Sequence, residues 1–158
     1  GVQSAVRLAG RQRGRSNMGK INYGRVVLGG LLAGVVINAG EYVLNEIVLG
    51  EQLAAAMAGL NLPAIGTEQI MKFVAITFVL GIVLVWIYAA IRPRFGAGVK
   101  TAIIAGVVTW LVGSCLPTTS MVIMGVLPAH LAALGCLWGL VEITIASIAG
   151  AWLYKENA

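Results

Sequence analysis

Four long apolar stretches divide the sequence. They cover residues 25–49, 70–91, 101–127 and 131–154, and few charged residues interrupt them. A transmembrane helix needs about 20 predominantly apolar residues, because each residue adds about 1.5 Å along the helix axis. All four stretches reach this length. The pattern therefore predicts an all-α fold, an integral membrane bundle of four transmembrane helices.

Composition and charge extend this prediction. Hydrophobic residues make up 59% of the 158 residues and charged residues only 11%, so the chain lacks the polar surface of a water-soluble domain. We predict a basic tail over residues 1–20 and a single transmembrane domain over 21–158. Ten of the eleven Lys and Arg residues share one side of the predicted bundle. Because cytoplasmic loops are rich in these residues, both termini are expected in the cytoplasm.

The arginines of this side are candidates for contacts with lipids or a partner. Anionic headgroups attract basic segments next to a membrane, and a neighbouring subunit could do the same. We assign these contacts to Arg7, Arg11, Arg13, Arg15, Arg92 and Arg94.

The first span carries polar residues at depths where lipid offers no hydrogen bonds. Asn38, Glu41, Tyr42 and Asn45 recur at intervals of three and four residues, which predicts that they share one helical face. This face should point into the bundle or towards a water-filled cavity. The fourth span has one carboxyl group, Glu142, near its middle.

Depth along each span brings these groups into one layer. At about 1.5 Å per residue, Glu41 and Thr118 each lie about 6 Å outward of the span centre, and Glu142 lies near the midplane. Pro117 is expected to kink the third span beside them. The sequence thus predicts a polar pocket that opens outward, formed by Asn38, Glu41, Tyr42, Asn45, Ser114, Cys115, Thr118 and Glu142.

Two interpretations of the pocket remain open. In the first, the carboxyls are protonated and hydrogen-bond side chains of neighbouring helices, so that they only hold the bundle together. In the second, they form a site for a cation, a proton or a small polar ligand, because ionisable groups inside a membrane are costly and often mark such sites.

His130 and the two cysteines add further candidate chemistry. His130 could ligate the metal of a haem or chlorin, or it is simply a polar residue at the membrane boundary. Cys115 and Cys136 lie in the outward half, where a disulfide could form, or they are ordinary apolar side chains. Their spacing fits no metal motif, and no metal site or other cofactor is assigned.

Several motif classes are missing from the sequence. It has no P-loop, dinucleotide motif, nucleophile elbow or paired-histidine metal motif, so we do not expect an enzyme. The basic cluster lacks the interleaved aromatic residues of a nucleic-acid binder, so nucleic acid is not an expected partner. Glycine pairs do occur, at Gly30 and Gly34 and at Gly135 and Gly139, with the spacing that lets helices approach closely.

A weak internal repeat runs through both halves in the same order. LLAGVV at residues 31–36 matches IIAGVV at 103–108, LGEQLAA at 49–55 matches LPAHLAA at 127–133, and WIY at 86–88 matches WLY at 152–154. Duplication of a two-helix unit would give parallel repeats. Chance similarity between apolar segments is the alternative.

Four further segments carry a resemblance to other proteins. They are INYGR, WIYAAIRPRFG, WGLVE and GAWLYKE, at residues 21–25, 86–96, 138–142 and 150–156. The chain resembles a group of small bacterial four-helix membrane proteins over about residues 18–156, and residues 1–17 depart from that pattern. The resemblance implies a multi-pass protein of the bacterial inner membrane. It implies no activity.

Two functions are consistent with these observations. The expected one is a non-catalytic accessory subunit of a larger bacterial membrane complex, which could be photosynthetic or respiratory, with lipids and other membrane subunits as partners. The alternative is a small transporter or ligand-binding membrane protein, oligomeric with itself, that uses Glu41 and Glu142.

Overall fold

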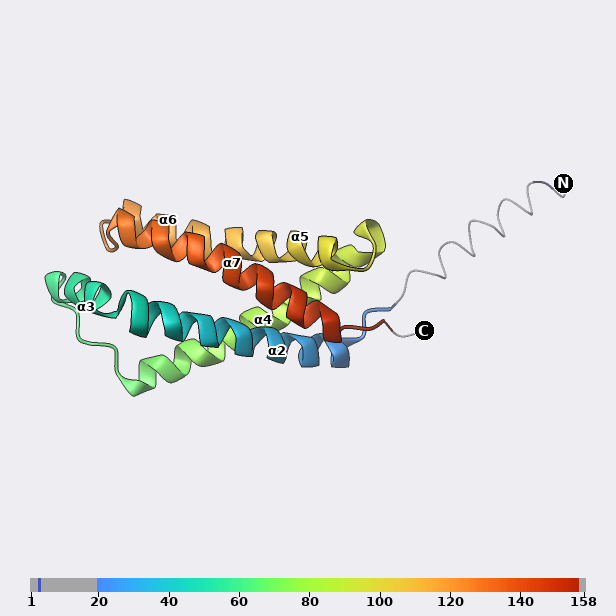
Figure 1. Ribbon diagram of the computed structural model, residues 1–158, viewed down its shortest axis with the longest axis horizontal. Helices are drawn as coiled ribbons and strands as arrows, with labels where there is room; N and C mark the ends of the chain where they lie inside the picture. Colours follow the sequence, from blue (N-terminus) through green and yellow to red (C-terminus); the bar gives the residue numbers. More distant parts are fainter. Residues whose placement is uncertain (1–2, 4–19, 157–158) are drawn as a thin grey trace.

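The structure, a computed structural model, describes residue 3 and residues 20–156. Four of its helical segments are long and apolar enough to cross a membrane, and no strand occurs in the described part of the chain (Figure 1). The prediction of an all-α, four-helix membrane bundle is confirmed. In order, the spans are α2 (Tyr23–Tyr42) with the π-helix η1 (Val43–Val48); α4 (Thr67–Phe95); α5 (Val99–Trp110), η2 (Leu111–Cys115) and α6 (Leu116–Ile123); and α7 (Ala129–Leu153).

The observed bounds differ from the predicted ones for local reasons. The second span continues through Pro93 to Phe95, and Gly96, with φ of 85°, ends it. The third span stops at Ile123 because the chain turns at Gly125, where φ is 73°. Both angles lie in the left-handed region that glycine tolerates best. A short helix, α3 (Gly50–Gly59), follows the first span outside the spanning segments.

The two ends of the bundle differ in charge. The described N-terminal and C-terminal segments lie at the same end, as an even number of spans requires (Figure 1). We call this the basic end, since it holds Lys20, Arg25, Arg92, Arg94, Lys100 and Lys155. The other end, with α3 and the turn before α7, is the opposite end. Which end faces the cytoplasm stays a prediction from the basic residues.

Small residues allow the spans to pack closely. A Cβ atom on Gly81 of α4 would lie 2.7 Å from the backbone nitrogen of Gly34 on α2, and one on Gly30 would collide with the backbone of Ile82. The glycine pair predicted in the first span is therefore buried against α4. The α7 span packs on both α2 and α5. Ser147 of α7 donates a hydrogen bond to the Ala102 carbonyl oxygen at 2.6 Å.

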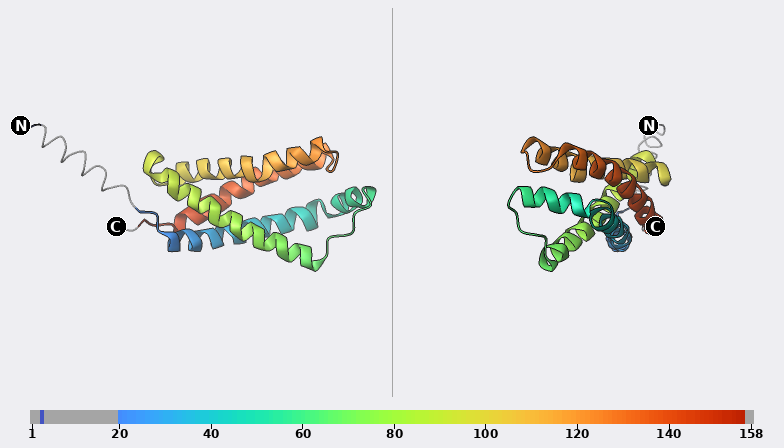
Figure 2. Two further views of the ribbon diagram at one scale, coloured as in Figure 1. Left: turned by 180° about the vertical axis from the view of Figure 1, so that it is seen from behind. Right: turned by 60° about the vertical axis from the view of Figure 1, so that its left-hand side comes forward.

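The core is concentrated in the half nearer the basic end. Leu84, Val85 and Tyr88 of α4 are buried there among residues of the other three spans. Tyr154 closes this end: its ring makes an edge contact with Tyr88, with centroids 5.9 Å apart, and Arg92 stacks over it at 5.6 Å. Towards the opposite end the helices diverge (Figure 2). The bundle is therefore closed at one end and more open at the other.

The two halves of the chain are built alike. Each half is a pair of spans, and the first span of each pair contains a π-helical segment, η1 or η2. This similarity agrees with the predicted repeat, and duplication of a two-helix unit stays a prediction.

Candidate functional site: the lateral groove at Glu142

A groove of about 620 Å³ opens sideways between the first and fourth spans. We call it the lateral groove. One wall comes from α2 and η1 and the other from α7, and the lining side chains are almost all apolar. Those used below are Gly40, Leu44 and Val48 on the first wall and Leu137, Trp138, Val141 and Glu142 on the second.

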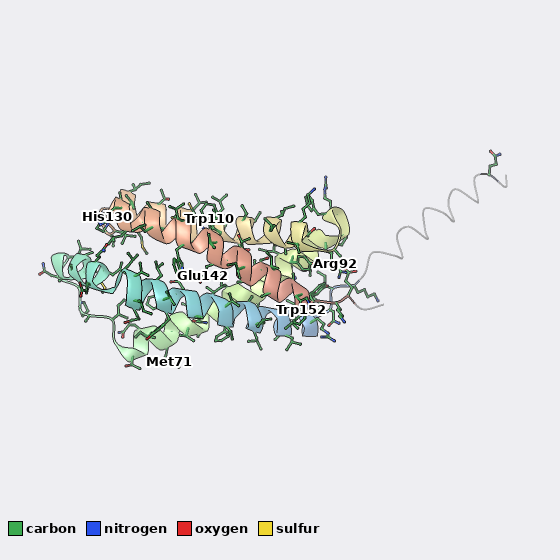
Figure 3. The ribbon with its side chains drawn as sticks, in the orientation of Figure 1. Met71, Arg92, Trp110, His130, Glu142 and Trp152 are labelled. Atoms are coloured by element: carbon green, nitrogen blue, oxygen red, sulfur yellow. The ribbon has the colours of Figure 1, made fainter. Side chains whose placement is uncertain are left out.

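Glu142 lies on the floor of this groove. The residue is only 7% exposed, and neither carboxyl oxygen has a hydrogen-bond partner among the described residues. Figure 3 shows it midway along the bundle, and the helical rise puts it more than about 15 Å from either end of α7. The only carboxyl in the fourth span is thus buried and unpaired.

Gly40 makes the space that the carboxyl occupies. A Cβ atom at this position would lie 2.6 Å from Cδ of Glu142 and 2.8 Å from its Oε2. Any side chain on residue 40 would therefore displace the carboxyl. The α2 backbone and Glu142 fit together through this glycine.

Trp138 supplies a second polar atom at the same place. It precedes Glu142 by one helical turn, so both side chains lie on the same face of α7. Its indole Nε1 is buried and makes no hydrogen bond of good geometry within the described residues, although it lies close enough to Glu142 for a weak one. The groove thus offers one buried N–H donor and one carboxyl group with no good partner.

Unpaired buried polar groups are uncommon because they are costly. Most buried donors and acceptors in native proteins are hydrogen-bonded, and leaving one unpaired costs about 1–3 kcal/mol. Lipid cannot supply the missing bonds. Glu41, the residue after Gly40 on α2, adds to the cost of an ionised Glu142, because its carboxyl would repel that charge.

The polar residues predicted on one face of the first span form hydrogen bonds within that span and do not gather in a shared pocket. Asn38 donates to the Gly34 carbonyl at 2.9 Å, and Asn45 donates to the Glu41 side chain at 2.6 Å. Asn45 is exposed, and Tyr42 is 63% exposed. Asn45 lies in the π-helix that follows Tyr42, and its side chain stays beside Glu41, to whose backbone carbonyl and carboxyl oxygens it donates.

The third span does not contribute to the lateral groove. Ser114 packs against Gly139, on the face of α7 that meets α5 and η2, and Thr118 is absent from the groove lining. The helix accommodates Pro117 by the π-helical segment η2 directly before it. Of the predicted pocket residues, only Glu142 lines the groove; Glu41 acts on it electrostatically from α2, and Ser114, Cys115 and Thr118 lie elsewhere.

The remaining candidates lie at other places. Cys115 and Cys136 are both free thiols, and they interact with each other across η2 and α7. His130 is exposed at the opposite end (Figure 3). Within the described residues, no three His, Cys, Asp or Glu side chains gather closely enough to hold a metal ion.

Arg94 is exposed at the basic end, and Arg92 forms a 3.5 Å ion pair with Glu156. Arg7, Arg11, Arg13 and Arg15 lie outside the described residues.

Glu142 is the one groove residue in the sequence-based set, and the two residues beside its carboxyl, Gly40 and Trp138, were missing from that set. The spacing of Trp138 and Glu142, four residues apart on one helix, is a signal that could have found the tryptophan. Gly40 has no such signal, because its role depends on which helix lies opposite.

Comparison with known proteins assigns no family. No protein-family model matches the chain, and no curated protein and no solved structure is similar to it. The function proposed below therefore rests on the lateral groove and its residues.

Proposed function

We propose that this protein binds a lipophilic small molecule in the lateral groove, with Glu142 and Trp138 holding the polar group of the ligand. The observation that carries the proposal is the buried Glu142 carboxyl without a partner at the floor of an apolar groove. A ligand would supply the hydrogen bonds that the helices do not. We also propose that the protein lies in the bacterial inner membrane, with its basic end in the cytoplasm.

The dimensions and lining of the groove support a small-molecule ligand. Binding sites for small molecules typically measure about 300–1,000 Å³ and combine apolar walls with a few polar groups. The lateral groove has this size and this composition. Its rim residues Leu137 and Val141 are 65% and 61% exposed on the side of the bundle that lipid would cover. A molecule dissolved in the bilayer can therefore enter from the side.

An accessory-subunit function has less support. In that function, small residues on the spans would pack against partner subunits and the arginine tail would dock at the cytoplasmic face. Gly30, Gly34 and Gly81 instead pack in the contact between α2 and α4 within the chain, and Gly150 packs against Gly29. The arginines of the tail lie outside the described residues.

Filling the groove should remove the ligand without unfolding the protein. We expect the protein, purified in mild detergent, to carry a lipophilic small molecule as a non-covalent mass adduct in native mass spectrometry. Gly40→Leu, which occupies the carboxyl's space, and Leu137→Trp, which narrows the groove from an exposed position, should each lower adduct occupancy by about tenfold, a loss of about 1.4 kcal/mol.

The matched control is Gly135→Leu. A Cβ atom on Gly135 has no neighbour within 4 Å, and this residue does not line the groove. It should keep the adduct. The wild type and the three variants could instead show equal adduct occupancy and equal thermal stability. That result would show that the groove does not hold the molecule.

A further inference from the structure

The lateral groove has carboxyl groups within reach and no basic side chain among the described residues. Glu142 lies on its floor, and Glu41, the residue after Gly40 on α2, acts on Glu142 electrostatically. Within the part of the chain that the structure describes, the hydrogen bond donated to the Glu41 carboxyl comes from Asn45, a neutral amide. Any cation near this site would have to come from elsewhere on the chain or from a ligand.

The cationic side chains of the described residues lie at the ends of the bundle. Lys72, at the start of α4, is already paired with Glu68 at 2.6 Å. The others lie at the basic end, where the core of the bundle separates them from the groove: Lys20, Arg25, Arg92, Arg94, Lys100 and Lys155. The protein thus offers no internal counter-charge to Glu142 within the described residues.

We propose that the ligand of the lateral groove is a lipophilic organic cation, whose charge pairs with Glu142 and whose apolar body fills the groove. This inference rests on the proposed function, since it names the chemical class of the molecule bound there. It follows from charge complementarity between the carboxyls of Glu142 and Glu41 and the bound molecule.

The physical argument begins with the low dielectric of the groove. A charge pair in an apolar, water-poor site interacts far more strongly than the same pair in water. A cation in the groove would favour the ionised form of Glu142 and pair with it, whereas an anion would find no positive charge there.

The lining also excludes a bare metal ion. Ca²⁺ and Mg²⁺ need six or more oxygen ligands, whereas the groove presents the oxygens of one carboxyl among apolar side chains. An organic cation needs only one charge partner and an apolar surface. The walls formed by Leu44, Val48 and Val141 provide that surface.

Two probe ions of the same size and shape test this charge preference. Tetraphenylphosphonium and tetraphenylborate differ in the sign of their charge. Their binding to the detergent-solubilised protein is measured by isothermal titration, with protein-free micelles as the blank. We expect the cation to bind at least about tenfold more tightly than the anion, a difference of about 1.4 kcal/mol.

Three variants locate the source of that preference. Glu142→Gln should weaken cation binding by about 10-fold to 100-fold, as expected for loss of a charged partner, and should remove the preference. Glu41→Gln should weaken it less, because Glu41 acts from a distance. Glu46→Gln should change nothing, because this exposed carboxyl lies outside the groove lining.

The outcomes separate the two proposals. Tighter binding of the cation, lost in Glu142→Gln and kept in Glu46→Gln, supports the inference. Equal binding of both ions that Gly40→Leu abolishes would overturn the cation preference and leave the groove as a binding site. Absence of cation binding, or cation binding that Gly40→Leu leaves unchanged, would overturn the inference, and in the second case the probe binds outside the groove.

Discussion

Replacement of Glu142 by methionine is expected to stabilise the protein by about 1–3 kcal/mol and to abolish ligand binding. The stabilisation follows because the variant removes a buried carboxyl that has no hydrogen-bond partner, and such a group costs about this much. Methionine is flexible and apolar, so it can fill the space opposite Gly40. Loss of binding follows because the ligand loses its polar contact.

The measurement is the free energy of unfolding, obtained by steric trapping in bicelles without added ligand. Glu142→Gln is the control, since an amide in the same place is again buried and unpaired and should bring no such gain. The opposite result, a loss of stability by 1 kcal/mol or more in Glu142→Met, would indicate that Glu142 holds neighbouring helices together. This experiment therefore decides between the two interpretations of the intramembrane carboxyls.

Replacement of Gly81 by alanine is expected to destabilise the bundle by about 1–3 kcal/mol, the usual cost of inserting atoms into a packed core. The added methyl group would lie 2.7 Å from the backbone nitrogen of Gly34 and 3.0 Å from its Cα. A backbone cannot move aside as a flexible side chain can. The α2 and α4 helices would have to separate along their contact.

Gly135→Ala is the matched control for this prediction. Its Cβ would meet nothing within 4 Å, and alanine favours a helix over glycine by about 0.5–1 kcal/mol. This variant should therefore be neutral or slightly more stable in the same unfolding assay. If Gly81→Ala and Gly135→Ala had equal stability, the close packing of α2 on α4 would be wrong.

The sequence was sufficient to predict the spans because the lipid bilayer imposes a simple rule. Apolar stretches of about 20 residues become helices, since every backbone polar group must be satisfied within the segment. The four predicted spans therefore agree with the structure to within a few residues. Helix ends that are set by a glycine, such as Gly96 with its positive φ, account for much of the difference between the predicted and the observed bounds.

The site was only partly predictable, because its geometry depends on helix register. Glu41 and Glu142 were expected to share one pocket, but only Glu142 lines the lateral groove, and Glu41 acts on it electrostatically. The π-helix after Tyr42 could not be foreseen, and Asn45 within it is exposed and donates side-chain hydrogen bonds to Glu41 of the same span. The contact between Gly40 and Glu142 depends on how α7 is rotated against α2, and one sequence does not contain that information.

Photolabelling tests the central claim most directly, that the lateral groove binds a lipophilic molecule at Glu142. A lipophilic amine carrying a diazirine is photolysed with the protein in nanodiscs, and its adducts are located by peptide mass spectrometry. We predict adducts concentrated on the groove walls, at Leu44, Val48, Leu137 and Val141, and lost in Glu142→Gln. Adducts spread evenly over exposed residues of all four spans, and unchanged in Glu142→Gln, would contradict the claim.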